Sequence, residues 1–177
     1  MGKGRIATAW LGGCSGCHMS VLDLDEALVE LAPSIEIVYG PLVDAKEYPE
    51  NVDVALIEGA VAAEEHQHLL RKIREHTKIL VALGDCAVTS NVPAMRNYVG
   101  KEPALKRAYF ELAAAQPQIP GQVVTPLVKT VHPLHNEVTV DVFVPGCPPS
   151  AARIRYVLAE LLAGRTPKLQ GELVTFG

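Results

Sequence analysis

The sequence contains no apolar stretch long enough to cross a membrane as a helix, and its first residues lead us to expect no signal peptide. Met1 to Gly4 lead directly into an apolar segment, without a twin-arginine leader. Positive charge is not in excess either, because 16 Lys and Arg stand against 20 Asp and Glu, giving a formal net charge of -4. These absences argue against nucleic-acid binding and direct membrane insertion, and they favour a cytoplasmic protein.

Cysteine is scarce, with four residues in a chain of 177: Cys14, Cys17, Cys86 and Cys147. In a reducing cytoplasm, such a set is more typical of metal binding or redox chemistry than of disulfides. Hydrophobic residues make up 49% and charged residues 20%, which excludes a disordered chain. The length suits a single domain over residues 1–177 with a sizeable core.

Apolar segments alternate with helical patterns along the chain. The predicted strands cover residues 5–11, 35–39, 53–59, 78–83 and 138–144. This alternation indicates an α/β fold with a mostly parallel sheet, and five strands favour the flavodoxin-like, doubly wound order.

Helical spacing predicts one continuous helix from Cys17 to Pro33, and further helices over residues 63–76 and 102–115 and from Ser150 onward. Residues 116–137 include four prolines and little periodicity, which predicts an irregular, extended segment that faces a partner.

Each cysteine follows the C-terminal end of a predicted strand. Cys14 and Cys17 lie on the turn after the first strand, Cys86 follows the fourth strand and Cys147 follows the fifth. Because the C-terminal ends of parallel strands share one edge of a sheet, and ligands bind there, the four thiols are expected to converge. The expected site therefore lies at the C-terminal edge of the sheet.

Two kinds of soft-metal site fit four thiolates, a structural zinc ion and a cubane iron–sulfur cluster. Structural zinc usually joins two local ligand pairs, whereas here only Cys14 and Cys17 form such a pair. A larger cubane needs ligands from several directions, which strand-end loops supply. The chemistry favours a cluster and leaves zinc and unlinked core cysteines open.

Four ordered motifs resemble the small subunit of nickel–iron hydrogenases and the homologous 20-kDa cluster subunit of respiratory complex I. They are WLGGCSGC at residues 10–17, Glu58-Gly59, ALGDCA at 82–87 and VPGCPP at 144–149. The complex I relatives carry adjacent cysteines in the first motif, so the two-residue gap here favours the hydrogenase branch. A short chain without a signal resembles the cytoplasmic, bidirectional, NAD(P)-linked type.

The resemblance implies that Cys14, Cys17, Cys86 and Cys147 bind the proximal 4Fe–4S cluster. That cluster would relay electrons between a nickel–iron centre on a large subunit and a flavin-containing diaphorase module that reduces NAD(P). No cysteine remains for the nickel–iron centre or for further clusters. The alternatives are a complex I-like subunit, a membrane-bound ferredoxin- or quinone-linked hydrogenase, and, less favoured, a flavin-binding or zinc-stabilised flavodoxin-like module.

Several other residues are expected beside the cluster. Glu58 ends a buried strand, so it either pairs with the large subunit, moves protons or makes a loop hydrogen bond. His18 either donates to a cluster sulfur or is an ordinary first-turn residue, and Asp85 is expected to order the Cys86 loop. The expected neighbours of the cluster are Gly13, Gly16, His18, Glu58, Asp85 and Pro148.

Overall fold

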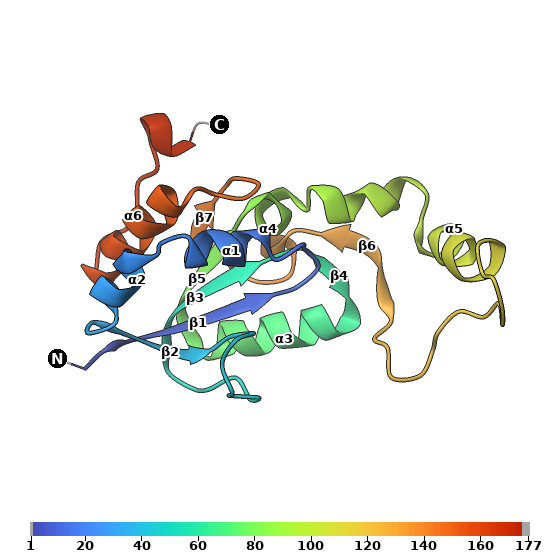
Figure 1. Ribbon diagram of the computed structural model, residues 1–177, viewed down its shortest axis with the longest axis horizontal. Coiled ribbons are helices and arrows are strands. Elements are labelled where there is room, and N and C mark those ends of the chain that lie inside the picture. The colour runs from blue at the N-terminus through green and yellow to red at the C-terminus, as the bar shows by residue number, and fades with distance from the viewer. Residues whose placement is uncertain (1, 175–177) are drawn as a thin grey trace.

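A five-stranded parallel sheet forms the centre of the computed structural model, which describes residues 2–174 (Figure 1). The strand order is β2-β1-β3-β5-β7. The strands are β1 (Gly4–Trp10), β2 (Ile35–Tyr39), β3 (Val52–Glu58), β5 (Thr77–Leu83) and β7 (Val142–Val144). This order confirms the predicted flavodoxin-like, doubly wound α/β fold.

Helices cover both faces of the sheet (Figure 1). Strand side chains alternate between the faces, so Leu56 joins one buried cluster and its neighbour Ile57 joins the other. Both faces are therefore buried, as in other doubly wound sheets. The helices on one face are α1 (Gly16–Leu22), α2 (Glu26–Leu31) and α6 (Ala151–Leu162), and α3 (Glu64–Glu75) lies on the other.

The predicted continuous helix from Cys17 to Pro33 is wrong, because the chain breaks between α1 and α2. Asp25 adopts a φ of 47° and a ψ of -119°, which are not helical values, so one helix cannot continue through this residue. Aspartates also favour caps and turns over helix interiors. Leu24, before the break, and Ala27, after it, are both buried in the core.

A second, two-stranded antiparallel sheet was not predicted. It pairs β4 (Val61–Ala63) with β6 (Leu127–His132). Of these two strands, β6 lies within residues 116–137, which were predicted to be irregular. Pro126 and Pro133 flank β6, where their missing N–H groups cost no ladder hydrogen bond. The prolines therefore mark the ends of a strand.

Short helical segments complete the described chain. The helix predicted over 102–115 ends at Glu111, and β7 is shorter than the predicted strand. The short segments are α4 (Asp85–Thr89), η1 (Val92–Tyr98), α5 (Lys101–Lys106), η2 (Arg107–Glu111), η3 (Leu134–Asn136) and η4 (Gly171–Val174). Every helix within residues 2–174, long or short, is too short or too polar to span a membrane.

Candidate metal centre

The four cysteines lie just beyond the C-terminal ends of three parallel strands. Cys14 and Cys17 follow β1, with Cys17 in the first turn of α1. Cys86 lies in α4 directly after β5, and Cys147 follows β7. Because β1, β5 and β7 belong to one parallel sheet, all four thiols stand at the same edge of it.

The three cysteine-bearing loops contact one another through glycines. A Cβ atom added to Gly84 would lie 2.2 Å from the Cys17 Sγ and 3.4 Å from the Gly146 carbonyl oxygen. One added to Gly16 would lie 3.3 Å from the Cys14 Sγ and 4.0 Å from the Cβ of Pro148. The loop before Cys86 thus approaches Cys17 closely, and Pro148, just after Cys147, lies beside the Cys14–Cys17 turn.

Electrostatics link the same thiols. Burial raises the pKa of the Cys17 thiol, and the charges of Glu58, Cys86, Cys14 and Cys147 raise it further. Burial and the neighbouring thiols also raise the pKa of Cys86. Thiols grouped in this way lose their protons when a cation binds among them, since a metal favours the thiolate.

The donor set and its surroundings fit an iron–sulfur cluster. A cubane takes one thiolate at each of four irons, and soft thiolates are its usual ligands. Gly16 and Gly84 leave the sulfurs of Cys14 and Cys17 free of a neighbouring Cβ. Within residues 2–174, no group of three or more His, Cys, Asp or Glu side chains lies close enough to hold a metal ion, and this includes the four cysteines.

A buried carboxylate–imidazole pair lies behind the first cysteine loop. Glu58 Oε2 accepts a hydrogen bond from the His18 backbone N–H at 3.0 Å and lies 2.6 Å from His18 Nδ1. Trp10, the register neighbour of Glu58 on β1, packs edge-on against the His18 ring at 5.1 Å. The carboxylate therefore fastens the start of α1 to the end of β3.

Asp85 hydrogen-bonds the Cys147 loop through both its side chain and its backbone, and the expectation that it orders the Cys86 loop stays a prediction. Its Oδ1 accepts from the Gly146 backbone N–H at 2.7 Å, and its own N–H donates to the Gly146 carbonyl at 2.8 Å. The Arg153 guanidinium donates from Nη1 to the Pro145 carbonyl oxygen.

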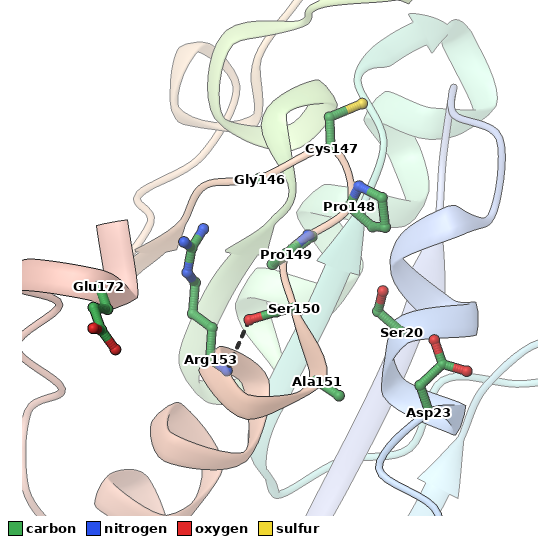
Figure 2. A pocket seen from close by; sticks show the side chains of 10 residues that line it. All are labelled: Ser20, Asp23, Gly146, Cys147, Pro148, Pro149, Ser150, Ala151, Arg153 and Glu172. Atoms are coloured by element: carbon green, nitrogen blue, oxygen red, sulfur yellow. Dashed lines mark hydrogen bonds between the residues drawn. The ribbon is translucent and has the colours of Figure 1, made fainter. Parts of the chain in front are cut away.

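The Cys147 loop borders a cavity of about 520 Å³, into which Ser20 and Asp23 project from the side of α1 (Figure 2). Arg153 lies on the other side of the loop and was missed in the sequence. Its signal is a charged residue four positions before the core residue Val157, on the face where α6 is otherwise apolar.

Comparison with known proteins identifies the family. The family described as NADH ubiquinone oxidoreductase, 20 Kd subunit, matches residues 14–161. The chain belongs to this family of 20-kDa oxidoreductase and hydrogenase small subunits. It is 40% identical over 169 residues to the NAD-reducing hydrogenase HoxS subunit delta of Cupriavidus necator, covering 93% of this chain and 81% of that protein.

Other relatives in the family carry names that do not mention NAD. One subunit of the F420-non-reducing hydrogenase vhu of Methanocaldococcus jannaschii is 40% identical over 172 residues, which is 96% of this chain and 60% of that relative. The chain thus spans about 60% of the length of that relative.

Solved structures agree with the family. A crystal structure of NAD+-reducing NiFe hydrogenase in the H2-reduced state superposes with a TM-score of 0.94 at 40% identity, covering 99% of both chains. A NiFeSe hydrogenase of Desulfomicrobium baculatum, at 17% identity and a TM-score of 0.60, shares the fold. The predicted relationship to the hydrogenase small subunits is confirmed.

Proposed function

We propose that this chain is the electron-transfer subunit of a nickel–iron hydrogenase and that it carries one proximal 4Fe–4S cluster. Cys14, Cys17, Cys86 and Cys147 would be the ligands. The observation that carries this proposal is the meeting of three cysteine-bearing loops at one edge of the sheet. The hydrogenase subunits among its relatives support it.

In the proposed assembly, a separate large subunit holds the nickel–iron centre and a flavin-containing diaphorase module reduces NAD(P). The chain sits between them in the cytoplasm and passes electrons from one to the other. The Cupriavidus relative and the NAD+-reducing hydrogenase structure support NAD as the acceptor. No bond-making catalysis is assigned to this chain.

The protein's own residues position and shield the cluster, whose chemistry when bound is the transfer of single electrons. Cys17 is buried and Cys86 is half-buried, so water has little access on that side, while Cys14 and Cys147 stand at the exposed rim. Glu58 holds α1 in place through His18. Gly84 leaves room for the Cys17 sulfur.

A different electron acceptor is the second candidate, and the F420-non-reducing relatives are the observation that favours it. Under this alternative, the same cluster would serve a complex I-like, ferredoxin-linked or quinone-linked hydrogenase. A flavin-binding or zinc-stabilised module without this relay is the remaining alternative.

Hydrogen-dependent reduction by the anaerobically purified complex distinguishes these functions. NAD, NADP, ferredoxin and a quinone are offered separately, and the proposal predicts that hydrogen reduces NAD or NADP. A Cys86→Ala variant of the same complex should lose this activity while keeping NADH-dependent dye reduction by the diaphorase. Activity with ferredoxin or quinone alone would reassign the acceptor, and unchanged activity in Cys86→Ala would remove the relay role.

A further inference from the structure

The peptide bond between Pro145 and Gly146, just before Cys147, is held from both sides by charged side chains. The Asp85 carboxylate accepts from the Gly146 N–H at 2.7 Å. On the opposite side, the Arg153 guanidinium donates to the Pro145 carbonyl oxygen. Both polar groups of this one peptide therefore have a charged partner, and hydrogen bonds with one charged partner are stronger than neutral ones.

The surrounding turn leaves this peptide little freedom to move. Gly146 has a φ of +140°, and a Cβ there would lie 2.6 Å from the Pro149 Cα and 3.1 Å from Arg153 Nη1. Arg153 is itself only 4% exposed. The two prolines that follow Cys147 have no N–H to donate, so the loop is fastened by hydrogen bonds on the Pro145–Gly146 side.

The same contacts tie two cysteine loops together. Asp85 stands one residue before Cys86, and its backbone N–H donates to the Gly146 carbonyl at 2.8 Å. Next to it, the Gly84 N–H donates to the Val144 carbonyl at 2.8 Å. Figure 2 shows the Cys147 side chain and Arg153 on different sides of this loop. The start of α4 and the loop after β7 therefore form one hydrogen-bonded unit.

We propose that Asp85 is a positioning residue that holds the Cys147 thiol in place and couples it to Cys86, with Arg153 bound to the other side of the same peptide. The proposal rests on the cluster function proposed above. Without the Asp85 carboxylate, the Cys147 loop loosens while the loop of Cys14 and Cys17 keeps its own contacts. The iron bound by Cys147 is then the first to leave.

This step would be a loss of iron without electron transfer. The bond between that iron and the Cys147 sulfur and its three bonds to inorganic sulfides would break, and a ferrous ion would pass to a chelator. A dicationic four-iron core would thereby become a neutral three-iron core. Added ferricyanide would then take one electron from that core and make it visible by electron paramagnetic resonance.

The test compares the wild type with Asp85→Ala, Asp85→Asn and Asp23→Ala, each purified anaerobically in its complex. Asp23 borders the same cavity beside Cys147 but is exposed, which makes it the matched control. A chelator is added, and the rate of iron release and the three-iron signal after ferricyanide are recorded. Thermal unfolding of each variant is measured in parallel.

Asp85→Ala should release iron about tenfold faster than the wild type, or faster still, because it loses a hydrogen bond with a charged partner. It should also give the three-iron signal. Asp85→Asn keeps an oxygen acceptor without the charge, so its rate should fall between the two, and Asp23→Ala should match the wild type. Any other order of rates overturns the proposal.

Two further outcomes are informative. If Asp85→Ala fails to fold, the test depends on Asp85→Asn alone. Iron release from Asp85→Asn that is no faster than from the wild type would then overturn the proposed role of Asp85. A wild-type sample that holds zinc and no iron refutes the proposed function itself. In the other outcome, the wild type holds a full cluster while Asp85→Ala releases iron to the chelator no faster than the wild type does. That result refutes only the role of Asp85.

Discussion

Among the described glycines, Gly84 is the one at which an added Cβ would lie closest to a cysteine sulfur. It has a φ of +83°, and a Cβ there would lie 2.2 Å from the Cys17 Sγ. Gly100 has nearly the same φ, +85°, but its nearest neighbour would be the Pro103 Cδ at 3.7 Å. Both positions need glycine for the positive φ, but only Gly84 also needs it to leave space for a cysteine sulfur. Comparing substitutions at the two positions therefore distinguishes the two requirements.

Replacing Gly84 by alanine should both strain the backbone and displace the Cys17 sulfur. Gly100→Ala should cost only the positive-φ strain, about 1 kcal/mol of unfolding free energy. Gly84→Ala should cost about 3 kcal/mol or more, because overpacking adds to that strain, and should lower the iron content of the protein. Urea unfolding and iron analysis measure both. Equal effects of the two variants would show that Gly84 is needed only for its conformation.

At the residue scale, the four cysteines could be selected as candidate ligands because each lies on the loop or first helical turn after an apolar strand segment. Their neighbours were harder to assign. The sequence could not show that Asp85 reaches the Cys147 loop, because its partner Gly146 lies 61 residues away. Nor could it show that Glu58, at the end of β3, contacts His18 in α1, which lies 40 residues earlier in the sequence. Such contacts depend on strand register and helix packing.

Outside the metal centre, the side chain of Glu137, just after η3, is only 7% exposed and connects a helix to a strand. Its side chain accepts hydrogen bonds from Gln67 Nε2 at 2.9 Å and contacts Arg71 and His132. Burial alone would raise the pKa of Glu137, but hydrogen bonds from Gln67, His132 and Arg71 outweigh it and hold the pKa below its ordinary value. Glu137 thus joins α3 to the end of β6.

This shift gives a defined dependence of stability on pH. Because the pKa of Glu137 is lowered in the folded protein, its contribution is complete above its ordinary pKa of 4.5 and is lost as pH falls through the lowered value. Glu137→Gln should be less stable at neutral pH by about 1–3 kcal/mol. It should also lose less stability than the wild type on acidification.

Urea unfolding between neutral and acidic pH measures this difference. Glu47→Gln is the control, since Glu47 pairs with Lys72 but its side chain is 88% exposed, and exposed pairs contribute little. Parallel stability curves for Glu137→Gln and the wild type would show that Glu137 is not linked to folding.

At the element scale, the central sheet was predictable because its strands are nearly continuous apolar runs separated by helical patterns. The break at Asp25 was not, since the apolar spacing continues across it and only the backbone conformation changes. The pairing of β4 with β6 was also missed. β4 is three residues long, and its partner lies more than 60 residues later along the chain.

At the scale of the whole molecule, the fold explains how thiols from distant parts of one chain are brought together. The sheet order places β1, β5 and β7 with the same direction, so their loops open at one edge. Large apolar side chains remain exposed near this edge, including Trp10 at the end of β1 and Met95 and Tyr98 on η1. Side chains of this kind are enriched in subunit interfaces, which suits the proposed hetero-oligomer.

Iron and acid-labile sulfide, measured together on the anaerobically purified protein, test the proposed cluster most directly. We expect about four irons and four sulfides per chain, and a marked loss of both when Cys86 or Cys147 is replaced by alanine. Protein with one zinc and no sulfide, or with an iron content that neither replacement changes, would contradict the assignment of the four cysteines to one cluster.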